Sequence, residues 1–273
     1  IGWDAADWKV INRLLNEGKM PTLAKFLQEG VHGRIKTLDP PLSPMLWTSI
    51  ATGFRADKHG IMGFIEPTPE GNAVRPVTST SRKVKAIWNI LNQNGLKSNV
   101  VSWWPSNPVE PINGCMVSNL YQVTNNEIDK WEMAPGTIHP KRLEETLKGY
   151  RVHINEMTAP IIKPFVPDME DMTDDKHQDM LRKISKVIAE MSSVHAASTY
   201  LQENEEWDFM AVYHDAIDHL CHLTMRFYPP QLPGVSDEHF QNYSKVVEGV
   251  YMLQDMMLER SLELCDDDTA VMI

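Results

Sequence analysis

The fold is decided by residues 207–222, which read WDFMAVYHDAIDHLCH. The first half of this stretch is a nearly continuous apolar run, and such runs are typical of strands that helices cover on both faces of a sheet. The second half places Asp and His residues directly after that strand. Ligands in open α/β sheets bind at the carboxyl ends of strands, so the stretch indicates both a fold class and the place of a site.

Two overlapping Asp and His pairs follow this strand, Asp215 with His219 and Asp218 with His222. Carboxylate oxygens and imidazole nitrogens are the ligands that Zn²⁺ and similar divalent ions take in proteins. The four-residue spacing is the same in both pairs. On spacing alone, either pair is a candidate for a metal site.

The rest of the chain alternates apolar runs with helical patterns. We expect strands over 31–37, 98–103 and 269–273, and helices over 83–94, 174–205 and 238–264. A strand, a helix and a second strand in that order imply parallel pairing through a right-handed crossover. The prediction is an α/β fold whose sheet is mostly parallel, with helices on both faces.

Residues 104–171 are less regular and hold most of the Pro-bounded turns. We expect them to form a cap or insertion within the domain. Such irregular segments carry specificity more often than the elements that support them.

A Pro-rich loop over residues 39–42 leads into a helix near Ser43. Proline fixes its own φ and disfavours helix in the preceding residue, so Pro44 fits the first helical position and Ser43 the N-cap. Free backbone N–H groups and the positive end of the helix dipole converge there and favour an alkoxide or a phosphate. Ser43 is therefore either a simple cap or a reactive hydroxyl, whereas Thr48 is expected to bond back within its helix.

Residues 1–7 read IGWDAAD, an apolar start that runs into an acidic turn before a helical pattern. Asp7 is placed to cap that helix, and Gly18 to end it. Asp4 is then the freer carboxylate, at the end of a strand.

These elements resemble the type I phosphodiesterase/nucleotide pyrophosphatase branch of the alkaline phosphatase superfamily, in particular its bacterial group of predicted phosphohydrolases or phosphomutases. The resemblance is carried by GWDAAD at 2–7, PPLSP at 40–44, WTS at 47–49, TG at 52–53, KHGI at 58–61 and Ile217-Asp218 with His222. It covers nearly the whole chain. It implies an alkaline phosphatase-like core.

The resemblance also implies roles for four residues. Asp4 and Ser43 would bind one of two divalent metal ions, and Ser43 would be the nucleophile. Asp218 and His222 would hold the other ion, because Ile217-Asp218 corresponds to an apolar-Asp pair of the family. Zn²⁺ is the expected metal, with Mn²⁺ or Mg²⁺ as alternatives.

The function implied is phosphoester hydrolysis through a phosphoseryl intermediate on Ser43. A phosphomutase on the same site is an alternative, in which an acceptor hydroxyl replaces water. A module that keeps the fold without the chemistry is a third hypothesis.

Two features depart from the family's pattern. The metal sites of the family need a further Asp-His pair and another His. The sequence begins at Ile1, inside an expected strand, and ends at Ile273, after an acidic turn and a short apolar run. We expect residues 1–273 to be an incomplete domain, inactive and weak in metal binding by itself, with the other ligands encoded beyond Ile273. Phe64 stands where well-studied phosphodiesterases place an Asn, which removes a side-chain donor to phosphate.

Composition restricts the partners. The chain has 273 residues and 42% hydrophobic content, enough for one sizeable core. A net charge of −11 argues against binding a nucleic-acid duplex, but not against a small phosphorylated substrate such as a nucleotide, because divalent ions reverse the charge locally. Three cysteines without zinc-finger spacing favour a reducing compartment such as the cytoplasm. No apolar run approaches the roughly 20 residues that span a bilayer, so no membrane partner is expected.

Overall fold

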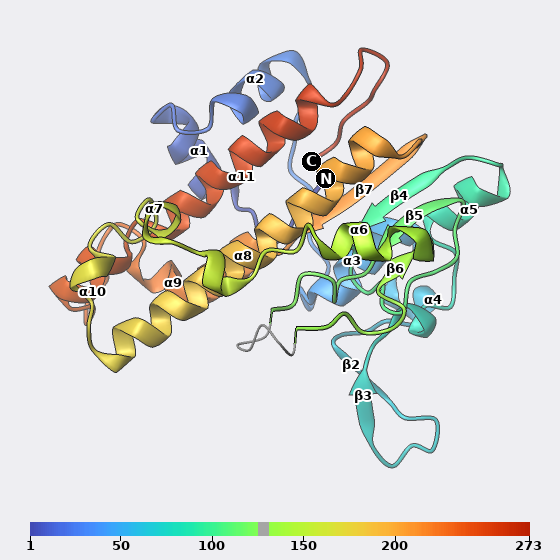
Figure 1. Cartoon of the computed structure of the whole chain (residues 1–273), viewed down its shortest axis with the longest axis horizontal. Helices are drawn as coiled ribbons and strands as arrows, with labels where there is room; N and C mark the ends of the chain where they lie inside the picture. The colour runs from blue at the N-terminus through green and yellow to red at the C-terminus, as the bar shows by residue number, and fades with distance from the viewer. Residues whose placement is uncertain (125–130) are drawn as a thin grey trace.

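The computed structural model describes residues 1–124 and 131–273, and its centre is a five-stranded sheet (Figure 1). The strands lie in the order β1-β7-β4-β5-β6. Their bounds are Gly2–Trp3 for β1, Phe209–His214 for β7, Ser98–Val101 for β4, Gly114–Val117 for β5 and Ile138–His139 for β6. The first four are parallel to their neighbours and only β6 is antiparallel, which confirms the predicted mostly parallel sheet.

Helices cover both faces of this sheet, as the apolar strands require. Neighbouring residues of β4 show the two faces, because Val100 packs in one hydrophobic cluster and Val101 in another. The Val101 cluster includes Val194 and Leu201 of α8 (Asp175–Asn204). The Val100 cluster includes residues of α3 (Ser43–Thr52) and α5 (Ile87–Gln93).

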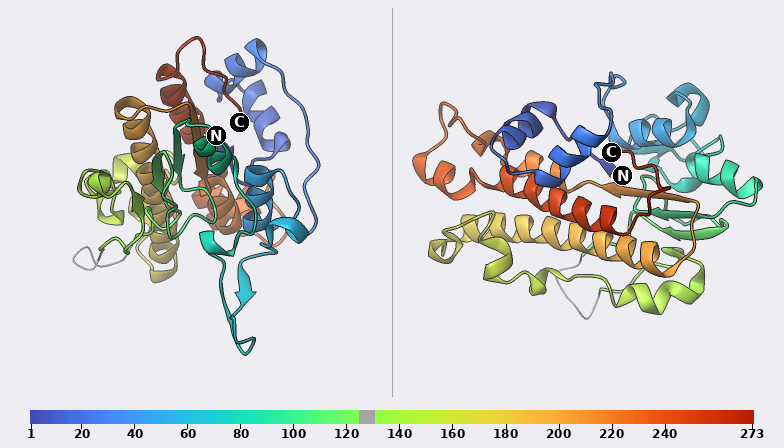
Figure 2. Two further views of the ribbon diagram at one scale, coloured as in Figure 1. Left: turned by 90° about the vertical axis from the view of Figure 1, so that its right-hand side faces the viewer. Right: turned by 90° about the horizontal axis from the view of Figure 1, so that it is seen from above.

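The largest core includes Trp3 of β1 and is built mainly from five helices. They are α1 (Trp8–Asn16), α2 (Pro21–Glu29), α8, α9 (Ala216–Thr224) and α11 (Val246–Glu263). Figures 1 and 2 show α8 and α11 running along the length of the molecule. The helix expected over 174–205 is present as α8, and its Leu181, Ile184 and Ile188 are all buried.

Shorter elements complete the chain. They are α4 (Ala56–His59), β2 (Ile65–Pro67), β3 (Val74–Pro76), α6 (Glu144–Lys148), α7 (Ala159–Ile162) and α10 (Asp237–Tyr243), with short 3₁₀ turns between them. β2 and β3 form an antiparallel hairpin that projects from the body of the molecule (Figure 1). None of the helices in the described residues has the length and apolar character needed to cross a bilayer.

Two predicted strands are wrong. Residues 31–37 form no strand, and their apolar Val31 and Ile35 are exposed, so nothing pairs with them or covers them. Residues 269–273 also form no strand. The amino group of Ile1 donates to the carbonyl of Met272 at 2.7 Å, and a single contact of this kind does not make a ladder.

Two predicted helices have different bounds. The helix expected over 83–94 begins only at Ile87, because Asn89 Oδ1 accepts from the backbone N–H of Ala86 at 2.9 Å and caps the helix there. The helix expected over 238–264 is broken into α10 and α11. Tyr243, at the end of α10, packs against Phe227 and His239. After the break, α11 packs in the largest core.

Residues 104–171 contribute β5 and β6 to the central sheet. Their expected role as a cap stays a prediction, and residues 125–130 of this segment lie outside the described residues.

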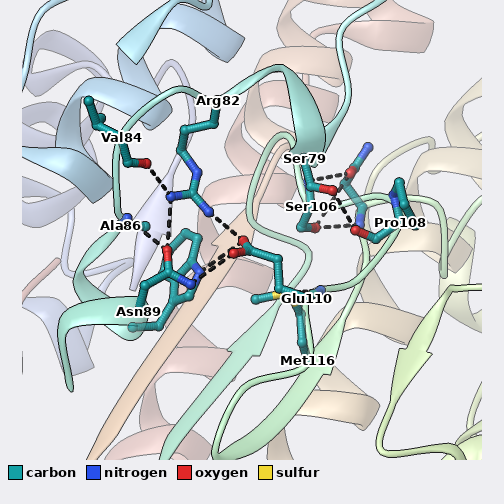
Figure 3. A network of polar contacts seen from close by, with 11 residues as sticks. Ser79, Arg82, Val84, Ala86, Asn89, Ser106, Pro108, Glu110 and Met116 are labelled. Atoms are coloured by element: carbon teal, nitrogen blue, oxygen red, sulfur yellow. Dashed lines mark hydrogen bonds and ion pairs between the residues drawn. The ribbon is translucent and has the colours of Figure 1, made fainter. Parts of the chain in front are cut away.

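A polar network ties this segment to the start of α5 (Figure 3). Arg82 forms an ion pair with Glu110, whose carboxylate also accepts from Trp88 Nε1 at 3.1 Å and Asn89 Nδ2 at 2.8 Å. Arg82 donates in addition to the carbonyl of Val84 and to Asn89 Oδ1. Since the Arg82 side chain is nearly buried and donates three hydrogen bonds, the network holds two loops beside the sheet in one arrangement.

Candidate functional site

Asp4 is the first residue after β1 and lies next to the end of β7. The parallel register pairs Trp3 with His214, and the N–H of Asp4 donates to the carbonyl of His214 at 2.9 Å. The side chain is 7% exposed. Asp4 therefore lies at the carboxyl edge of the sheet, where the sequence predicted it.

Asp7 turns the chain from this site into α1. Its carboxylate accepts from the N–H of Lys9 at 2.6 Å, which confirms the predicted N-cap. Its own N–H donates to the hydroxyl of Tyr251 at 3.0 Å. Asp7 is thus a structural residue, and Asp4 the carboxylate of the site.

Ser43 is the first residue of α3 rather than its N-cap, so the predicted cap is wrong by one position. Leu42 is the extended cap residue, and its carbonyl already accepts the first helical hydrogen bond, from Leu46 at 3.0 Å. The hydroxyl of Ser43 instead donates to Asp4 Oδ2 at 2.8 Å. Thr48 bonds back to the carbonyl of Pro44 at 2.6 Å, as predicted.

The Asp4 carboxylate accepts two further hydrogen bonds that the sequence analysis missed. The hydroxyl of Tyr213 donates to Oδ2 at 2.7 Å, and Trp47 Nε1 donates to Oδ1 at 3.0 Å. A signal for Trp47 was its position four residues after Ser43, which places both on one face of the helix. Within the described residues no Lys or Arg forms an ion pair with Asp4, so its negative charge is held by neutral donors.

The two Asp and His pairs lie on α9, which begins directly after β7. Asp215 is the N-cap of this helix, and Asp218 lies in its first turn. His222 Nε2 is 3.4 Å from Asp218 Oδ1, so this pair faces one side of the helix, and the His222 side chain is exposed. The other pair is joined through the backbone, where the N–H of His219 donates to the carbonyl of Asp215.

The carboxylates of this edge influence one another. Burial raises the pKa of Asp218, and the negative charge of Asp4 raises it further. Burial likewise raises the pKa of Asp215, with smaller contributions from Asp4 and Asp218. Burial and the nearby Asp4 also raise the pKa of Tyr213, which keeps its hydroxyl a neutral donor. Acidic groups that disfavour each other's ionisation are a setting that a divalent cation would stabilise.

The donor types at this edge suit a divalent ion, but the donor number falls short. No group of three or more His, Cys, Asp or Glu side chains in the described part of the chain is placed to hold a metal. The structure brings Asp4 together with Ser43, and Asp218 together with His222. Each pair supplies two donors of a coordination sphere that takes four or more.

His214 and Phe64 do not donate to the Asp4 carboxylate, whose hydrogen bonds come from Ser43, Trp47 and Tyr213. His214 is buried in β7, and burial lowers its pKa to about 3, so it is neutral. Phe64 packs edge to face on Trp104, with ring centroids 5.3 Å apart. The contact between Phe64 and Trp104 does not involve the carboxylates of the site.

Comparisons with known proteins agree with the fold. Two crystal structures of phosphonoacetate hydrolase from Sinorhizobium meliloti 1021, in complex with phosphonoacetate and with phosphonoformate, match with TM-scores of 0.54 and 0.52 at 14% and 13% identity. Both matches cover 96% of this chain and 52% of the other, so the chain spans about half the length of these structures. No curated protein matches the sequence. Residues 1–273 match the family described as type I phosphodiesterase / nucleotide pyrophosphatase. The chain therefore belongs to the type I phosphodiesterase / nucleotide pyrophosphatase family.

Proposed function

We propose that this chain carries the nucleophile and part of the metal site of a phosphoester hydrolase. One observation carries the proposal: the hydroxyl of Ser43, at the start of α3, donates to the buried carboxylate of Asp4 at 2.8 Å. The positive end of a helix favours an alkoxide or a phosphate at that hydroxyl, and the adjacent carboxylate is a ligand type that divalent ions take. The family match over the whole chain supports the same reaction class.

The proposed ligands are the two pairs described above. Asp4 and Ser43 would hold one divalent ion, and Asp218 and His222 the other, with Zn²⁺ expected and Mn²⁺ or Mg²⁺ as alternatives. A bound divalent ion supplies positive charge that lowers the pKa of a coordinated hydroxyl and stabilises charge on phosphoryl oxygens. Further donors are needed to complete both sites.

In the proposed reaction, Ser43 Oγ forms a bond to phosphorus as the bond between phosphorus and the leaving oxygen breaks. The leaving group departs with that electron pair and takes up a proton. Water then attacks the phosphoseryl group, which releases inorganic phosphate if the substrate is a monoester, or a phosphate monoester if it is a diester, and returns the Ser43 hydroxyl. The substrate would be a small phosphorylated molecule such as a nucleotide, and the three free cysteines suit a reducing compartment such as the cytoplasm.

The test is hydrolysis of p-nitrophenyl phosphate, bis-p-nitrophenyl phosphate and phosphonoacetate by the full-length protein, together with a measurement of bound metal. Ser43→Ala should abolish turnover. Ser49→Ala is the matched control on the same helix, because its hydroxyl bonds to the carbonyl of Met45 and to His59, away from Asp4. Equal activity of Ser43→Ala and the parent would contradict the proposal.

A module without catalysis is the second candidate. It is favoured by Phe64, which packs on Trp104 where the family places an amide donor, and by the two incomplete donor pairs. Protein without bound metal or turnover on any of these substrates would support it. Transfer of phosphate to an acceptor hydroxyl without release of inorganic phosphate would instead indicate a phosphomutase.

A further inference from the structure

We infer that Trp47 and Tyr213 are positioning residues, which hold the Asp4 carboxylate in the orientation that Ser43 and a metal ion need. This inference rests on the proposed function and concerns the same site. Both side chains contact Asp4 and neither is a metal ligand by its chemistry, since an indole N–H has no lone pair to offer and the tyrosine hydroxyl is committed to Oδ2.

Trp47 spans the gap between α3, which carries Ser43, and β1, which leads to Asp4. Its indole lies across Gly2 so closely that a Cβ at that position would be 2.6 Å from Trp47 Cη2. Only glycine leaves room for this approach. The same indole donates to Asp4 Oδ1. The ring therefore fixes the distance between α3 and β1 and also supplies one hydrogen bond to the carboxylate.

Tyr213 reaches Asp4 from the neighbouring strand. The parallel register of β1 and β7 pairs Tyr213 with Gly2. Because Gly2 has no side chain, the side chain of Tyr213 can pass it and reach Asp4. The Tyr213 ring packs edge-on against Trp47 with centroids 4.8 Å apart. The two donors therefore support each other as well as the carboxylate.

A second layer restrains Trp47. Trp103 Nε1 donates to the backbone carbonyl of Trp47 at 3.0 Å, and the two rings meet edge to face at 5.3 Å. Trp103 in turn contacts Trp88, which is part of the Arg82 and Glu110 network in Figure 3. This layered support is what a precisely oriented ligand requires, because carboxylates that bind metals are held by hydrogen bonds from outside the metal site.

Loss of the hydrogen bonds from Trp47 and Tyr213 should change the orientation of the Asp4 carboxylate rather than the fold. With Tyr213 and Trp47 in place, three donors fix the Asp4 carboxylate, two on Oδ2 and one on Oδ1. Tyr213→Phe removes the hydroxyl and keeps the ring, whereas Trp47→Phe removes the N–H together with part of the indole, and either change frees the carboxylate to rotate about its χ torsions. The metal site should weaken while the fold persists.

The experiment compares Tyr213→Phe and Trp47→Phe with matched controls from elsewhere in the chain. Tyr121→Phe removes a buried hydroxyl that donates to the carbonyl of Leu147, and Trp207→Phe removes an indole N–H that donates to the carbonyl of Gln202. Zn²⁺ affinity of the full-length protein, as parent and in each variant, is measured by competition with a chromophoric chelator. The difference in Zn²⁺ affinity between the parent and Asp4→Asn gives the contribution of this site.

We expect the two site variants to bind Zn²⁺ about 10- to 100-fold more weakly and the two controls to match the parent. Parent-like affinity in both site variants would overturn the inference. Should Asp4→Asn itself bind Zn²⁺ like the parent, the proposed function fails, and crystal structures of the two site variants decide the inference. An Asp4 carboxylate turned away from Ser43 supports positioning, whereas an unmoved one refutes it.

Discussion

The hydroxyl of Ser43 and the carboxylate of Asp4 are hydrogen-bonded at 2.8 Å although they are 39 residues apart in sequence. One is the first residue of α3 and the other the first residue after β1. Neither side chain is used to cap the element beside it. Residues that a fold holds together without a local structural task are strong candidates for chemistry.

Gly2→Ala should destabilise the protein by about 1 to 3 kcal/mol, because the added methyl group would overlap Trp47 and force the indole away. Urea denaturation measures the change. Gly33→Ala is the control, since a Cβ there meets nothing within 4 Å. A Gly2→Ala protein as stable as the parent would show that the indole moves at little cost.

Asp255→Ala should cost about 2 to 3 kcal/mol of stability. The buried carboxylate of Asp255 in α11 accepts from the N–H groups of Thr22 and Leu23 at 3.1 and 2.7 Å. It thus caps α2, whose own cap residue, Met20, makes no side-chain hydrogen bond. Thermal and urea unfolding measure the stability of the three proteins. Asp255→Asn should have a stability between those of the parent and Asp255→Ala, because the amide keeps one acceptor. Equal stability of all three proteins would contradict this role.

His195 should make the protein less stable in mild acid. Burial, with a smaller effect from Arg260, lowers the pKa of His195 to about 4, below the usual value of about 6.5. Between these pH values the unfolded chain binds a proton that the folded chain does not, so stability falls as pH drops from 6.5 to 4. The loss amounts to at most about 3 kcal/mol.

The measurement for His195 is the free energy of unfolding from pH 7 to pH 4 in the parent and in His195→Gln. The variant should lose part of the slope and keep the rest, because His214, with a pKa of about 3, contributes to both proteins. Identical slopes would mean that His195 is protonated in the folded protein.

Zn²⁺ should stabilise the full-length parent protein against thermal unfolding. A ligand that binds only the folded state adds about 2.7 kcal/mol when present at 100 times its Kd. Scanning calorimetry with Zn²⁺ and then with EDTA measures the shift in Tm. Asp4→Asn should lose the shift, and a shift of equal size in that variant would place the bound metal elsewhere.

Local patterns were enough for several elements. Asp7 caps α1 as expected, because a cap depends on residues two or three positions away, and α8 has nearly its expected bounds. The apolar run of β7 is also found, close to its predicted bounds. Residues 31–37 show the limit of the same reasoning, since an apolar pattern makes a strand only where a partner strand exists.

The family resemblance implied the four candidate ligands, whereas local patterns in the sequence determined the fold class and the edge of the sheet where the polar residues gather. Those depend on strand and helix signals that are local in the chain. Only the tertiary structure decided that Trp47 and Tyr213 hold Asp4, and that Asp255 caps a helix 232 residues away. Contacts of this kind depend on which elements pack side by side and at what distance, and no short-range pattern encodes either.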